Sequence, residues 1–101
     1  MAYFIIAVEN CTADQRNEIS KYVGKIGGYW HWMSDLWLVN TYGDDSAADM
    51  RDAIQAKAGS PICIVLKVNL PPGSVNWAGL FPTDKSKRWA DWLNKTWKPG
   101  V

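Results

Sequence analysis

The chain has 101 residues, which fits a single domain of ordinary size. Hydrophobic residues make up 48% and charged residues 21%, as in a globular protein, and the formal net charge of +1 excludes a strongly basic nucleic-acid binder. No stretch approaches the ~20 apolar residues of a membrane span, and no signal peptide is expected. Cys11 and Cys63 lie in or beside apolar runs, so we predict buried thiols and a cytoplasmic protein.

The first third of the chain predicts a strand followed by a helix. Residues 3–8 form a continuous β-branched and aromatic run, which is typical of a buried central strand. Thr12 and Gln15 then have the spacing of a capping box, and apolar residues recur at helical spacing behind it. Gly27 and Gly28 are expected to end this helix in the left-handed conformation that glycine accepts.

Two strand-like runs, residues 29–33 and 36–42, come next and predict a hairpin with Ser34 and Asp35 as its turn. A two-residue turn determines which side chains lie opposite one another across the hairpin. The expected cross-strand pairs are Trp32 with Trp37 and Trp30 with Val39.

The second half of the chain predicts another helix and another strand. Ser46 and Asp49 have the spacing of a second capping box, which opens a helix through about Ala58, and Gly59 ends it. Residues 62–68 are apolar except for Lys67 and rich in β-branched residues, so they predict the fourth strand.

A Pro-Pro-Gly-Ser stretch then interrupts the pattern. It divides the expected single domain, residues 1–101, into a core over 1–69 and a loop with a last helix over 70–101. The last helix is expected to begin near Pro82 or Thr83. One side of it holds the apolar residues Trp89, Trp92, Leu93 and Trp97.

The order of these elements predicts an α+β domain of the ferredoxin-like βαββαβ kind, with a C-terminal Trp-rich helix added. Its four-stranded antiparallel sheet is expected to carry two helices on one face. The other face is apolar as well, because hydrophobic residues occupy both alternating sets of the first and fourth strands. That face needs the Trp-rich C-terminal helix, a second subunit or both as a cover, and of these we expect a second subunit, in a two-fold homodimer. The expected interface residues are Phe4, Ile6, Val8, Trp30, Trp32 and Trp37.

Several segments resemble motifs of SinR-like proteins, which are small relatives of the CRISPR adaptation nuclease. The stretch GYWHWMSDLWLV at 28–39 is similar to their WWHYLDSTWLI, and SAADMRDAI at 46–54 resembles the opening of their second helix. NWAGL at 76–80, followed by WADWL at 89–93, is similar to their NWAGWL and AWDWL ending. The resemblance spans most of the chain and implies a dimeric ferredoxin-like fold.

The resemblance also implies a position for a metal site. The nuclease relatives carry an aspartate at the end of the first strand, and two such aspartates, one from each subunit, bind a divalent metal near the dimer axis. Glu9 stands at the corresponding position here, so the aspartate itself is absent. A carboxylate binds Mg2+ through its oxygens, which makes Glu9 the candidate catalytic and metal residue if the chain is a nuclease. Otherwise Glu9 is a solvated charge at a strand end, and no metal or cofactor is expected.

The last third of the chain combines aromatic and basic residues, as a surface that stacks bases and contacts phosphates does. His31, the one histidine, has no partners at zinc-ligand spacing and is either a ligand contact or a packed side chain. The seven tryptophans either build a second core and dimer seam or bind a ligand. The candidate ligand-binding residues are Trp77, Trp97, Lys85, Lys87, Arg88 and His31.

Three functions are compatible with these features. The first is a homodimer without catalytic activity that holds a nucleotide or short nucleic acid between its subunits, in one version sequestering a nucleotide signal in phage or bacterial defence. The second is a protein-interaction module of a defence or anti-defence system. The third is a Mg2+- or Mn2+-dependent nuclease that uses Glu9 from each subunit. None of them involves a membrane.

Overall fold

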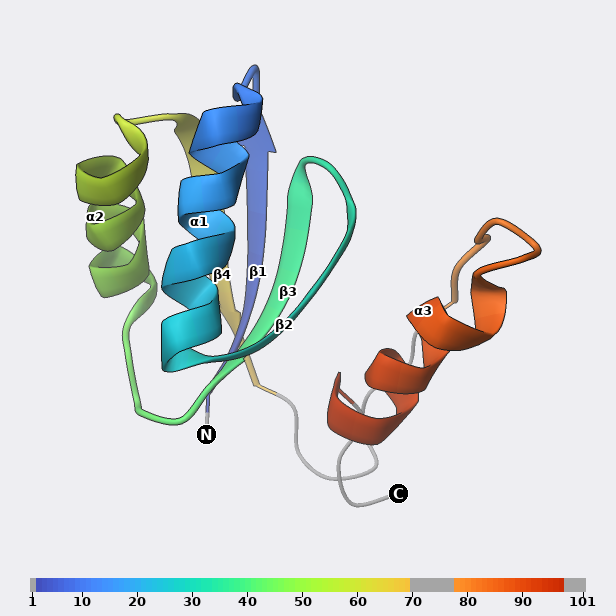
Figure 1. Ribbon diagram of the computed structural model, residues 1–101. Helices are drawn as coiled ribbons and strands as arrows, with labels where there is room; N and C mark the ends of the chain where they lie inside the picture. Colours follow the sequence, from blue (N-terminus) through green and yellow to red (C-terminus); the bar gives the residue numbers. More distant parts are fainter. Residues whose placement is uncertain (1, 70–77, 98–101) are drawn as a thin grey trace. The chain divides into compact units, whose positions relative to one another are not determined.

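The computed structural model describes residues 2–69 and 78–97. The chain divides into two compact units, Met1–Val68 and Asn69–Val101 (Figure 1). The first unit has an α+β fold with helices packed on a four-stranded antiparallel sheet. No helix within the described ranges is long and apolar enough to cross a membrane.

The sheet has the strand order β2-β3-β1-β4, so β1 and β3 are central and β2 and β4 are its edges. All four expected strands are present, and neighbours are antiparallel throughout. Their bounds are Ala2–Glu9 for β1, Gly27–Met33 for β2, Leu36–Thr41 for β3 and Ile62–Val68 for β4. The continuous apolar run of β1 is explained by its place between two neighbours and under two helices.

Both capping boxes are confirmed. In α1, Ala13–Ile26, the Thr12 hydroxyl accepts from the Gln15 amide at 3.1 Å and the Gln15 side chain accepts from the Thr12 amide at 2.9 Å. α2, Ala47–Ala58, begins with the same reciprocal pair between Ser46 and its third helical residue. The Gln15 side chain also donates to the Ala58 carbonyl at 3.0 Å, which ties the start of α1 to the end of α2.

The two helices cover the face of the sheet that we expected to be a subunit interface. Phe4, Ile6, Val8 and Trp37 are buried in the core beneath α1 and α2, so the prediction that they line an interface is wrong. Strand alternation separates two apolar sets but does not say which set the helices cover. The β1–β3 register places Phe4 and Ile6 opposite Val39 and Trp37, so the large apolar side chains of Phe4 and Trp37 share this face. The helical residues in the core are Ile19, Val23, Met50, Ile54 and Ala58.

The hairpin register differs from the expected one. Met33 lies opposite Leu36, as the predicted two-residue turn at Ser34 and Asp35 requires. The register then shifts, so Trp30 lies opposite Leu38 rather than Val39, and the ladder does not pair Trp32 with Trp37. With both pairs included, the four residues 30–33 of β2 lie opposite the three residues 36–38 of β3, which is the signature of a β-bulge. The predicted pairs follow from the length of the turn, on the assumption that both strands have the same number of residues. That assumption fails where one strand contains an extra residue.

Gly27 and Gly28 are required for a different reason than the one predicted. Gly27 has φ 173°, which is extended rather than left-handed, and it begins β2. A Cβ on Gly27 would collide with the Asn40 carbonyl, and one on Gly28 would lie 2.8 Å from the Asn40 side-chain oxygen. The close approach of β3 thus selects these glycines. Gly59, in contrast, has φ 75° and ends α2 in the expected left-handed conformation.

In the second unit the helix α3 spans Ser86–Trp92 and continues as a π-helical turn, η1, over Leu93–Trp97. It starts three residues later than expected because residues 83–85 form a turn in which the Lys85 amide donates to the Pro82 carbonyl at 3.0 Å. The wider π-helical turn brings Trp92 and Trp97 together, with ring centroids 5.9 Å apart.

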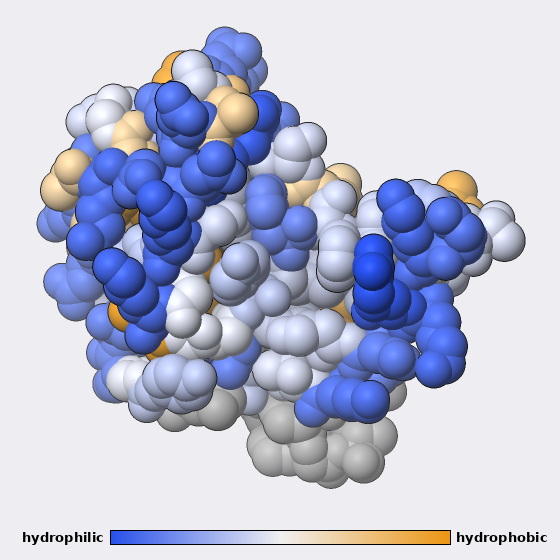
Figure 2. All heavy atoms as spheres, viewed as in Figure 1, coloured by the Kyte–Doolittle hydropathy of each residue, from blue (hydrophilic) through white to orange (hydrophobic). Residues whose placement is uncertain are grey.

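Hydrophilic residues dominate the outer sides of α1 and α2 (Figure 2). A helix that is polar outside and apolar inside packs on one side only, so these helices form the outer layer of the first unit.

We predict that Trp37→Phe and Ser20→Ala each lower the free energy of unfolding. The Trp37 indole N–H donates to the Ser20 hydroxyl at 3.1 Å in a partly buried bond, and leaving one partner of such a bond unsatisfied costs ~1–3 kcal/mol. Trp32→Phe is the control, because Trp32 is 41% exposed and exposed substitutions stay within ~0.5 kcal/mol. Urea unfolding followed by circular dichroism measures all three, and equal midpoints for the Trp37 and Trp32 variants would contradict the assignment.

Candidate functional site

An aliphatic stripe runs along β4 on the face of the sheet opposite α1 and α2, which we call the far face. Its members, Ile62, Ile64 and Leu66, are 64%, 56% and 47% exposed, and we call them the β4 stripe. A single exposed aliphatic residue is ordinary, but three successive outward positions on one strand form a contiguous apolar patch. The stripe is therefore a candidate contact surface.

Two hollows flank β4 and share Cys63 and Ile64. The first has a volume of about 250 Å3 and is lined by Ala7, Val8, Glu9, Ile62, Cys63 and Ile64. The second, about 230 Å3, lies where α2 faces β4 and is lined by Ala47, Ala48, Arg51, Cys63, Ile64 and Val65. The first is mainly apolar, the second also includes the charged Arg51, and both are open, so they suit side chains of a macromolecule better than an enclosed small ligand.

Glu9 lies at the rim of the first hollow, exposed at the end of β1 and opposite Ile62. Residues 2–69 and 78–97 contain no group of three His, Cys, Asp or Glu side chains placed to hold a metal ion. A metal site at this position would therefore need Glu9 from two copies of the chain.

The remaining predicted interface residues lie on β2. Trp30 belongs to the far face, because its partner Leu38 lies opposite Ile5 on that face, and it is buried. Trp32 and Met33 are 41% and 53% exposed at the end of the hairpin. The structure thus leaves two of the six expected interface residues, Trp30 and Trp32, outside the core beneath the helices.

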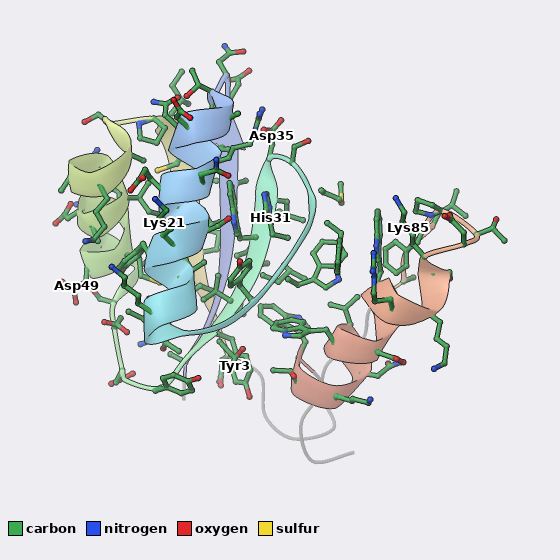
Figure 3. All side chains as sticks on the ribbon, in the orientation of Figure 1. Tyr3, Lys21, His31, Asp35, Asp49 and Lys85 are labelled. Atoms are coloured by element: carbon green, nitrogen blue, oxygen red, sulfur yellow. The ribbon has the colours of Figure 1, made fainter. Side chains whose placement is uncertain are left out.

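His31 is packed within its own hairpin. Its ring stacks on the Trp37 indole with centroids 4.0 Å apart and planes 3° from parallel, and Nδ1 lies 3.0 Å from the Leu36 carbonyl, to which it donates. Figure 3 shows His31 on the hairpin, with Asp35 at its tip. The Asp35 carboxylate accepts from the Arg16 guanidinium at 3.0 Å, so the hairpin tip is tied to the start of α1.

The basic candidates belong to the second unit. Lys85, Lys87 and Arg88 are exposed at the start of α3, and the Lys87 ammonium lies 3.8 Å from the Asp91 carboxylate. Close by in sequence, the rings of Phe81 and Trp89 form a tilted pair with centroids 5.3 Å apart. Trp97 is buried, which argues against a stacking role for its ring, and Trp77 lies outside the described residues.

A third hollow, of about 530 Å3, escaped the sequence reasoning. It lies along α1 beside Tyr29 of β2 and is lined by Asp14, Asn17, Glu18, Ser20, Lys21 and Tyr29. Charges of both signs line it, and the Lys21 ammonium already pairs with Glu18 at 3.2 Å. Polar residues on the outer side of a helix carry no sequence signal that separates such a depression from an ordinary solvated surface.

Cys11 and Cys63 both carry free thiols. Burial raises the pKa of the Cys11 thiol, and burial together with the nearby Cys11 raises the pKa of the Cys63 thiol. The thiolate is the reactive form, so a raised pKa makes both side chains less reactive at neutral pH.

We predict that both thiols react with a chromogenic disulfide reagent more slowly than free cysteine does at pH 7, and that their rates keep rising above the ordinary thiol pKa of ~8.5. Cys11, which is buried, should react more slowly than the half-buried Cys63. Separate Cys11→Ser and Cys63→Ser variants assign the two rates. A folded Cys11 that matches free cysteine would contradict its burial.

No protein-family model matches the chain, and no curated protein or solved structure is detectably similar to it. The resemblance to SinR-like proteins therefore rests on the Trp-containing motifs of the sequence, and it stays a prediction.

Proposed function

We propose that this chain is a binding module without catalytic activity that works as a homodimer, with the β4 stripe at the contact between its subunits. The observation that carries the proposal is the exposure of Ile62, Ile64 and Leu66 on one edge of the sheet. Removing apolar surface from water stabilises a complex by roughly 25 cal/mol per Å2 before the cost of association. A second copy supplies the same stripe, and two-fold symmetry is the commonest arrangement of such pairs.

The proposal includes a ferredoxin-like fold and membership of the SinR-like group. The element order β1-α1-β2-β3-α2-β4 and the packing of both helices on one core support the ferredoxin-like assignment. The motif at 28–39, which forms most of the β2–β3 hairpin, supports the SinR-like assignment.

A second candidate function is the binding of a nucleotide or short nucleic acid by the second unit. The exposed Lys85, Lys87 and Arg88 and the neighbouring ring pair of Phe81 and Trp89 support it. Basic side chains contact phosphates, and an aromatic ring next to them offers a stacking surface worth ~1–3 kcal/mol per base.

For the homodimer, we predict that native mass spectrometry finds two chains per particle and that Ile64→Lys shifts the population to one. Ile64 is 56% exposed, so the lysine is tolerated in a lone subunit, but in the contact it replaces an aliphatic side chain that packs against the stripe of the second copy. Leu80→Lys is the matched control, because Leu80 is an exposed leucine in the second unit. A wild-type protein that remains a single chain at tens of micromolar would exclude the proposal.

For the second candidate, we predict that RNA, DNA or a cyclic nucleotide quenches tryptophan fluorescence, and that added salt weakens the binding. Changing Lys85, Lys87 and Arg88 together to Gln should weaken binding and reduce its salt dependence. The control changes Lys21 and Lys57, on α1 and α2, to Gln in the same way. Unchanged fluorescence across the whole ligand panel would rule this function out.

A further inference from the structure

β4 is a sheet edge with few of the features that stop edge strands from pairing. It pairs with β1 without a break from Ile62 to Val68, and the described part of the sheet has no strand on its other side. Natural proteins protect such edges with prolines, bulges or outward charges. The seven residues of β4 contain no proline, their register shows no bulge, and Lys67 is their one charged residue. An edge of this kind can pair with another strand.

The one charge on β4 is engaged within its own chain. The Lys67 ammonium donates to the Asp44 carboxylate and to the Asp45 carbonyl, each at 2.9 Å, and lies 5.8 Å from the centre of the Phe4 ring. This hydrogen bond lowers the pKa of Asp44, which favours its carboxylate form. Lys67 is directed toward the helix side of the sheet, so its charge does little to prevent another strand from pairing with β4.

Space for another strand lies beside α2. The hollow of about 230 Å3 between α2 and β4 is lined on the helix side by the small Ala47 and Ala48 and by Arg51, whose guanidinium pairs with Asp52 at 3.0 Å. On the strand side, Val65 is only partly buried although it faces the core. An added strand would cover Val65 and Cys63 and would lie beside the Arg51 side chain.

We propose that β4 pairs antiparallel with β4 of a second copy, joining the two sheets into one of eight strands. This inference rests on the proposed homodimer and specifies its contact. A two-fold axis perpendicular to the sheet keeps the helices of both copies on the same side. Residues that lie opposite one another in the two strands must then point to the same face of the joined sheet. This holds only if the axis passes beside one residue of β4, which then lies opposite the same residue of the second copy, and not between two residues.

Val65 is the residue that best satisfies this geometry. With the axis beside Val65, all seven residues of β4 are paired, and Ile64 lies opposite Leu66 of the second copy on the far face. Lys67 then lies opposite Cys63 of the second copy, so the two lysines are about 13 Å apart along the strands, beyond the ~10 Å screening length at 0.1 M salt. Shifting the axis toward Lys67 would bring the like charges together, and shifting it toward Ile62 would leave residues unpaired.

The second copy fits this edge better than an unrelated peptide because β4 is its own complement. An antiparallel partner must present aliphatic residues at alternate positions on one face, and β4 presents Ile62, Ile64, Leu66 and Val68 in this way. Cross-strand aliphatic pairs then contribute ~0.2–1 kcal/mol each beyond the backbone bonds.

The experiment is disulfide trapping at two positions. Val65→Cys, in a chain that also carries Cys11→Ser and Cys63→Ser, should shift from the mass of one chain to that of two on a non-reducing gel after oxidation with diamide. Opposed Cβ atoms in antiparallel strands lie ~4.5–5.5 Å apart, close to disulfide distance. Asn17→Cys in the same background, on α1, is the control and should stay at the mass of one chain.

A second variant tests the register and does not alter Val65. Lys67→Cys with Cys11→Ser should crosslink to the native Cys63 of the other copy, whereas the same chain with Cys63→Ser should not. Native mass spectrometry of the wild type separates the outcomes. A dimer in which neither Val65→Cys nor Lys67→Cys crosslinks overturns the β4 pairing while the homodimer stands; a lone chain overturns both.

Discussion

The burial of Trp37 between the sheet and α1 is the contact on which the rest of the first unit depends. Its indole is fully buried, donates to Ser20 of α1 and is covered on one side by the His31 ring. Trp37 therefore connects three elements: its own central strand β3, the helix α1 and the edge strand β2. Trp37 is also the largest of the fully buried side chains in the described residues, and buried aromatic rings contribute strongly to core stability.

The position of Trp37 decides which face of the sheet the helices cover. Because Ile6 lies opposite Trp37 and Phe4 opposite Val39, the face with these side chains is the one that α1 and α2 bury. The aliphatic residues of β4 on the other face are then left exposed. One packing choice thus produces both the stability of the core and the surface that we associate with function.

Much of the fold is readable from local patterns. The capping residues Thr12 and Ser46 and the apolar runs of β1 and β4 predicted their elements within one or two residues, because capping and burial act over short stretches of chain. The choice between the two apolar faces was not readable, since alternation treats Phe4 and Ile5 alike. The bulge before Met33 and the role of Gly27 also escaped, because both depend on how β3 approaches β2.

The candidate site was predicted in outline only. That the sheet carries a second apolar face follows from the alternation in β4, yet the residues assigned to an interface were mostly those of the core. The packing of the His31 ring on Trp37 could not be predicted either, because it depends on the observed geometry of the hairpin. Side-chain partners that are distant in sequence need the tertiary structure.

The β-bulge in β2 bears on how many copies a joined sheet contains. β2 is the edge opposite β4, and its extra residue between Trp30 and Met33 breaks the even ladder that another strand needs. Each molecule has one regular edge, β4, and one edge with a bulge, β2. If two molecules pair through β4, the joined sheet has only the bulged β2 edges left, and these do not offer an even ladder to a further strand. Growth by this route ends at a closed pair instead of a fibre.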